Sequence, residues 1–172
     1  MRTLIYKRTH HGDPDPETGE FGCNDCMGTV RGREFDAVIG IGGIGPEPKR
    51  NGIAGKLTWI GIGARKIYDS DGRRGPRVRF DRFWYQGEHG PLLEKTYPAL
   101  ARRMYDTNVR VLTHFPPDET ELDRDVERIL CLAKAAPSSS QSTEPDLKTF
   151  RAICVSEKSR RKSCASPSRK RC

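Results

Sequence analysis

The chain has 172 residues, a formal net charge of +8 and a sequence pI near 9.4. Hydrophobic residues make up only 34% of it and charged residues 31%, so part of the chain is too polar for a buried core. No apolar run approaches the roughly 20 residues of a membrane helix, and the start lacks a signal-peptide pattern. We therefore expect a cytoplasmic protein without membrane contact, whose basic character favours a nucleotide or nucleic acid as partner. The sequence indicates no particular cofactor or oligomeric state.

Three strands and a polar loop are predicted in the first half of the chain. The strands are short apolar runs, rich in β-branched residues and bounded by Gly or Pro, at residues 2–7, 35–41 and 56–63. Residues 10–22 are expected to form a turn-rich loop, because two Asp-Pro steps bias the backbone away from helix. A short helix capped by Asn24 or Asp25 is expected to follow the loop.

The second half predicts a strand, a helix, another strand and a long helix. Residues 77–85 alternate charged with apolar side chains, as in a half-exposed strand. Residues 98–108 begin with a proline that suits a first helical turn. A strand is expected over 108–115, and an amphipathic helix capped by Asp118 over 118–136. Together these elements predict an α/β fold with a single mixed sheet and flanking helices.

The predicted domain covers residues 1–136, and residues 137–172 differ from it in composition. A Ser/Pro-rich linker leads into a tail whose last seventeen residues contain seven Lys or Arg. Such a segment buries too little apolar surface to fold, so we expect a disordered basic tail. It could hold nucleic acid loosely or serve only as a solvated terminus. Three of the six cysteines lie in this polar region, which favours reduced thiols over disulfides.

The stretch DAVIGIGGIG, residues 36–45, contains a GxGxxG pattern directly after a predicted strand. A Rossmann site would need a helix at these glycines and an acid after the next strand. Pro46 and Pro48 make that helix less favourable, and the strand over 56–63 ends in glycine. A P-loop is also excluded, because Arg50 occupies the place of its first glycine.

Two interpretations of these glycines are left open. The glycines could allow close packing of strands and turns, with a solvated loop behind them. Alternatively, Gly42, Gly43 and Gly45 could present backbone N–H groups to an anion, with Lys56 supplying positive charge.

The polar loop is the segment richest in groups that transfer protons or bind metal. Within seventeen residues the chain contains His10, His11, Asp13, Asp15, Cys23, Asp25 and Cys26. In the catalytic interpretation, one histidine acts as acid or base, Asp13 or Asp25 is its partner, and Cys26 is a possible nucleophile. The Cys-x-x-Cys spacing lacks a second compact pair, so no structural zinc is expected. The alternative is a loop whose polar residues mainly form turns.

Three runs resemble a known group of domains: YKRTHHGDPDPETGEFGCNDCMG, FDAVIGIGGIG and NGIAGKLTWIGIG. They are similar to small bacterial and phage domains grouped as nucleotide-modification-associated, which are linked to DNA base hypermodification. The resemblance covers about residues 1–115 and excludes the basic tail. It implies a nucleotide or modified-base substrate and carries no established mechanism.

The polar loop and the glycines each follow the C-terminal end of a predicted strand. If these strands are parallel neighbours, both segments leave the same edge of the sheet, where α/β ligand sites usually form. The first interpretation is therefore a nucleotide- or base-binding domain linked to nucleotide or DNA modification. One alternative is a metal-dependent hydrolase or nuclease that uses the His/Asp loop. Another is a non-catalytic nucleic-acid-binding protein in which Arg77, Arg79, Arg82 and Trp84 contact phosphates and bases.

Overall fold

The structure is a computed structural model of the chain. It describes residues 1–8, 14, 19–21, 33–67, 77–107, 109–116 and 120–135. The chain divides into two units, Met1–Gln141 and Ser142–Cys172, and every described residue belongs to the first. The predicted domain boundary after residue 136, the basic tail and the predicted helix near Asn24 lie outside the described residues.

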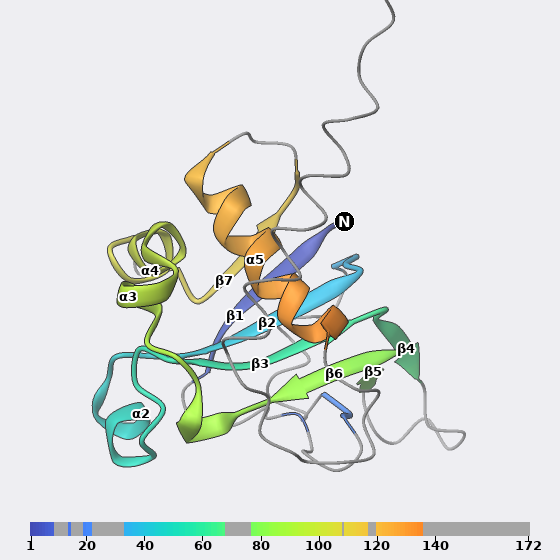
Figure 1. Ribbon diagram of the computed structural model, residues 1–172. Helices are drawn as coiled ribbons and strands as arrows, with labels where there is room; N and C mark the ends of the chain where they lie inside the picture. Colours follow the sequence, from blue (N-terminus) through green and yellow to red (C-terminus); the bar gives the residue numbers. More distant parts are fainter. Residues whose placement is uncertain are drawn as a thin grey trace, which may run out of the picture. The chain divides into compact units, whose positions relative to one another are not determined.

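A five-stranded mixed sheet organises the first unit, with the strand order β6-β3-β2-β1-β7 (Figure 1). Its strands are β1 (Thr3–Arg8), β2 (Ala37–Gly42), β3 (Leu57–Ile62), β6 (Arg82–Tyr85) and β7 (Val111–His114). Strands β1 and β2 are parallel, and the other neighbours are antiparallel. The predicted α/β fold with a mixed sheet is thus confirmed. A second sheet pairs β4 (Arg65–Ile67) with β5 (Arg77–Arg79).

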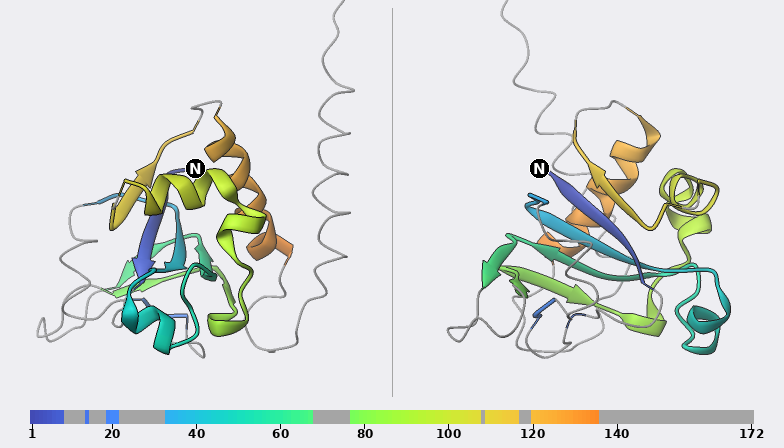
Figure 2. Two further views of the ribbon diagram at one scale, coloured as in Figure 1. Left: turned by 90° about the vertical axis from the view of Figure 1, so that its left-hand side faces the viewer. Right: turned by 180° about the vertical axis from the view of Figure 1, so that it is seen from behind.

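Helices cover one face of the five-stranded sheet (Figures 1 and 2). The described helices are α2 (Pro46–Arg50), α3 (Leu93–Thr96), α4 (Pro98–Tyr105) and α5 (Glu121–Ala135), with a 3-10 turn η1 (Gly87–His89), and α2 lies beyond the sheet end rather than on this face. Helix α5 packs across β3 and β6 with α4 beside it, and α2 follows the end of β2. Alternation along the strands directs Ile5, Ile39 and Ile60 to this side, where all three are fully buried.

Aromatic side chains fill the opposite face of the sheet. Trp59 of β3 lies between Phe21 and Phe83, with ring centroids 5.1 and 5.9 Å away. Phe21 and Val78 of β5 exchange two backbone hydrogen bonds of 2.8 Å, which fastens the segment 19–21 to the small sheet. Phe21 and Val78 are buried in the same cluster as Trp59, so these peripheral segments close the second half of the core.

Residues 77–85 form two strands in different sheets rather than the single strand predicted. Strand β5 ends at Arg79 and β6 begins at Arg82. Between them, Phe80 packs on the aromatic face with its ring 5.8 Å from Trp59, and the Asp81 N–H donates to Ile62 O. Two charged residues in succession, Asp81 and Arg82, interrupt the alternation at this break, and that interruption was the sequence signal for two strands.

The helix predicted over 98–108 is preceded by a separate short helix and ends earlier. Helices α3 and α4 meet at Tyr97, whose φ of −139° is not helical. Asp125 of α5 then caps α4, because its Oδ2 accepts from the N–H groups of Ala99 and Leu100 at 2.9 and 3.1 Å. Of the helices in the described ranges, none combines the length and apolar character that crossing a membrane requires.

Candidate functional site

The carboxyl ends of β1 and β2 lie side by side. Their parallel register runs from Thr3 opposite Ala37 to Arg8 opposite Gly42, and the Gly43 N–H donates to Arg8 O at 2.8 Å. This confirms the condition on which the sequence argument depended. Both the polar loop and the glycine turn leave the sheet at this edge.

The proposed chemical groups of the polar loop lie outside the described residues. They are His10, His11, Asp13, Asp25 and Cys26, together with Asp15 and Cys23. Their acid–base, nucleophilic and metal-binding roles stay predictions. In the part of the chain that the structure does describe, no three His, Cys, Asp or Glu side chains gather as a metal site.

The glycine turn is held by its own backbone hydrogen bonds. The Gly42 N–H donates to Lys56 O at 2.8 Å, and the Gly43 N–H donates to Arg8 O. Both N–H groups are thus engaged within the fold, and their predicted role toward an anion stays a prediction. A Cβ on Gly42 would lie 1.7 Å from Ile53 O, which shows that close packing requires glycine there.

Glycines in the two neighbouring strands β2 and β3 also clear space for aromatic rings. A Cβ on Gly40 would lie 1.8 Å from Nε1 of Trp59, and one on Gly61 would lie 2.5 Å from the Phe80 ring. The absence of a side chain at both positions is therefore used by the fold. Large side chains of the core occupy the cleared space, so the packing interpretation accounts for both positions.

Gly45 precedes a helix that the two prolines were expected to disfavour. It is the N-cap of α2, with φ −71° and ψ −179°, and Pro46 and Pro48 fall within the first turn. The N–H groups of a first turn have no intrahelical partners, so prolines cost no helical hydrogen bond there. The exclusion of a Rossmann site at these glycines nevertheless holds, because β3 runs antiparallel to β2, so β2, α2 and β3 do not form a βαβ unit.

Lys56 lies just before β3, with its ammonium turned to the 3-10 turn η1. Its Nζ donates to the backbone oxygen of Glu88 at 2.6 Å. The side chain thus has a structural partner already, and its predicted contact with a ligand stays a prediction.

A cluster that the sequence argument missed lies at the same edge, and we call it the Lys7 cluster: Lys7, Gly42, Gly43 and Tyr105. Lys7 is only 9% exposed, and its Nζ lies 5.5 Å from the centroid of the Tyr105 ring. The Tyr105 hydroxyl donates to Gly42 O at 2.7 Å. A Cβ on Gly43 would lie 3.7 Å from Cγ of Lys7, so the lysine stem runs beside this glycine.

The electrostatics of the Lys7 cluster favour an anion. Burial lowers the pKa of Lys7, because removal of water penalises the charged ammonium. No carboxylate within the described ranges forms an ion pair with Lys7. Burial, and less strongly the charge of Glu94, raises the pKa of Tyr105, so its hydroxyl stays protonated. A lysine inside the apolar run TLIYKR was the sequence signal for this position.

The four strand residues suggested for nucleic-acid contact do not form one exposed face. Arg77 and Arg79 of β5 both pair with Glu20. Arg82 of β6 donates from Nη1 to Lys134 O at 2.5 Å, and Trp84 is only 7% exposed. Stacking of Trp84 on a base, as suggested from the sequence, would require it to leave the core.

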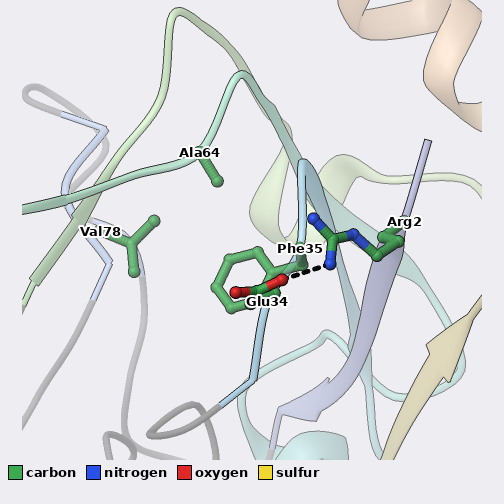
Figure 3. Close-up of a pocket in the computed structure, with 5 residues that line it drawn as sticks. All are labelled: Arg2, Glu34, Phe35, Ala64 and Val78. Carbon is green, nitrogen blue, oxygen red and sulfur yellow. Dashed lines mark hydrogen bonds and ion pairs between the residues drawn. The ribbon is translucent and has the colours of Figure 1, made fainter.

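A cavity of about 320 Å³ lies near the start of β1, away from the Lys7 cluster (Figure 3). Phe35, Ala64 and Val78 contribute its apolar lining. Arg2 and Glu34 turn toward each other across it, with Nη1 and Oε2 2.5 Å apart. Because Arg2 and Glu34 already form an ion pair with each other, the described lining of this cavity has no unpaired charge to bind a charged ligand, whereas the Lys7 cluster has one.

Comparisons of the chain with protein-family models, curated proteins and solved structures find no match.

Proposed function

We propose that the protein binds a nucleotide or a related phosphate-bearing ligand at the edge where β1 and β2 end. The observation that carries the proposal is Lys7, a buried cation at the carboxyl end of a parallel strand pair with no carboxylate beside it among the described residues. Ligands of open α/β sheets bind outside such strand ends. An anion there would offset the unfavourable desolvation of the ammonium, since charges attract more strongly away from water.

The other members of the Lys7 cluster would position this cation. The Tyr105 ring holds the Lys7 ammonium by a cation–π contact, and its hydroxyl ties the ring to Gly42 O. The lysine stem runs within van der Waals range of Gly43. The resemblance to nucleotide-modification-associated domains supports the same ligand class. In this proposal, any acid–base or nucleophilic step falls to the polar loop that begins after Arg8.

Titration calorimetry with phosphate, pyrophosphate and nucleoside mono- and triphosphates tests the proposal. We expect Lys7→Met to weaken binding by about tenfold or more, because it removes a poorly solvated charge that faces the ligand. Lys49→Met is the matched control: it removes an exposed lysine of α2 next to the glycine turn, and we expect less than about a twofold change.

Thermal melts and circular dichroism would accompany the titrations. Lys7→Met should stay folded, because methionine fills a similar volume and removes the desolvation penalty of the buried ammonium. The proposal fails if no phosphate compound binds the unmodified protein at millimolar concentration. It also fails if folded Lys7→Met binds as tightly as the unmodified protein does.

A further inference from the structure

A larger groove, of about 810 Å³, lies between α4, β7 and the start of α5. Sites for small organic ligands commonly enclose about 300–1,000 Å³. The groove is separate from the Lys7 cluster, because its lining residue His114 lies opposite Thr3 at the amino end of β1, whereas Lys7 lies near the other end. None of the residues that line this groove belongs to the candidate sites predicted from the sequence.

A buried histidine–aspartate pair lies at the junction of β7 and α5. Nε2 of His114 is 2.5 Å from Oδ1 of Asp123, and the two side chains are 4% and 14% exposed. Both atoms are shielded from solvent, and they form a close polar contact without hydrogen-bond geometry, so Nε2 is not open to a ligand. Since His114 also lines the groove, a ligand there would have to use Nδ1.

Two arginines of α4 provide positive charge along the same groove. Arg102 and Arg103 are exposed and belong to the last turn of the helix. Neither forms an ion pair with a carboxylate in the described segments. Asp106 and Glu121 line the groove as well, and they disfavour a ligand with several negative charges.

An apolar surface completes the groove. Phe115, directly after β7, is 60% exposed, and Leu112 of β7 belongs to the same lining. A planar apolar group would rest on the exposed Phe115 ring. The groove therefore combines a cationic region, a buried imidazole and an apolar platform.

We propose that this groove is a second ligand site, which takes a small organic anion of low charge. The acidic group of the ligand pairs with Arg102 and Arg103, a neighbouring polar atom meets Nδ1 of His114, and the apolar part lies on Phe115. A carboxylate and a phosphate monoester share this chemistry. The site is independent of the phosphate site at Lys7, and His114 acts in it as a ligand-positioning and hydrogen-bonding group.

Nuclear magnetic resonance of the histidine rings tests this site with benzoate and phenyl phosphate as probes. We expect saturable shifts of the His114 ring signals while those of His89, an exposed histidine outside the groove, stay unchanged. The double variant Arg102→Gln/Arg103→Gln should weaken binding by about tenfold or more. Arg124→Gln, which removes an exposed arginine of α5 outside the groove lining, should change it less than about twofold.

The two probes identify the acidic group: tighter binding of benzoate assigns a carboxylate ligand, and tighter binding of phenyl phosphate assigns a phosphate monoester.

Asp123→Asn should alter the His114 shifts on ligand binding, because the ring loses its charged partner. Lys7→Met should leave the binding of both probes intact, which separates this test from that of the phosphate site. If neither probe produces a saturable shift up to about 50 mM, or if the double variant binds equally well, the ion pair only fastens β7 to α5 and the proposal is wrong.

Discussion

At the scale of single residues, glycine performs two different tasks in the turn that follows β2. Gly42 lies so close to the chain at Ile53 that a Cβ would approach Ile53 O to 1.7 Å. Gly45 has open space around it, since the nearest atom to its Cβ position would be 4.0 Å away, and its φ of −71° suits any residue. The same residue type is thus required at one position and replaceable three residues later.

This contrast predicts opposite results for two alanine substitutions. Gly42→Ala should lower the free energy of unfolding by about 3 kcal/mol or more, because backbone must move to admit the methyl group. Gly45→Ala should change it by less than about 1 kcal/mol. Urea unfolding followed by tryptophan fluorescence measures both. Equal stability of the two variants would show that Gly42 is not a packing position.

At the scale of elements, an ion-pair network fastens the segment 19–21 to β5. Glu20 accepts hydrogen bonds from Arg79 and, at 2.9 Å, from Arg77, and its side chain is 17% exposed. Its neighbour Phe21 is fully buried over Trp59. The network therefore helps to keep an aromatic cover on the second face of the sheet.

We expect this network to make stability depend on pH. The hydrogen bond from Arg79, aided by Arg77, lowers the pKa of Glu20. A carboxyl group with a lowered pKa in the folded state stabilises the fold above its unfolded pKa, and this contribution disappears as the pH falls through the lowered value. Glu20→Gln should therefore cost about 1 kcal/mol near neutral pH and little in strong acid.

Urea titrations at pH 7 and at pH 3 or below measure this difference. The exposed Glu127→Gln of α5 serves as the control and should show no such trend. A penalty for Glu20→Gln that is the same at both pH values would mean that the loss comes from packing rather than from charge.

At the scale of the whole molecule, the predicted separation of a folded unit from a basic tail has a direct test. Helix α5 ends at Ala135, and the buried core identified in the described residues lies before that point. A fragment ending at Gln141 should melt within about 2 °C of the full chain. A drop of many degrees would place residues beyond Gln141 within the folded unit.

The same fragment tests nucleic-acid binding by the tail. The full chain should bind DNA or RNA weakly, with an affinity that falls steeply as salt rises, because Lys and Arg contacts release counterions. The fragment should lose most of this binding. Binding that survives truncation and resists salt would point to the folded unit instead.

What the sequence by itself determined about this protein was local. Apolar runs set the approximate positions of β1, β2, β3 and β7, and the spacing of apolar residues set α5, whose Val126 and Ile129 are buried. The incompatibility with a P-loop could also be read directly from residue order. These features depend on neighbours within a few positions, where backbone preferences and side-chain periodicity act.

The tertiary structure alone decided how distant segments meet. It paired β1 with β2 in parallel and brought Tyr105 over Lys7. It also placed Asp125 at the start of α4, and Trp59 against Gly40. Each of these contacts joins residues at least 19 positions apart, so no local pattern encodes it. Their geometry follows from the packing of the whole core, and for this reason the glycines could be found from the sequence while their structural purpose could not.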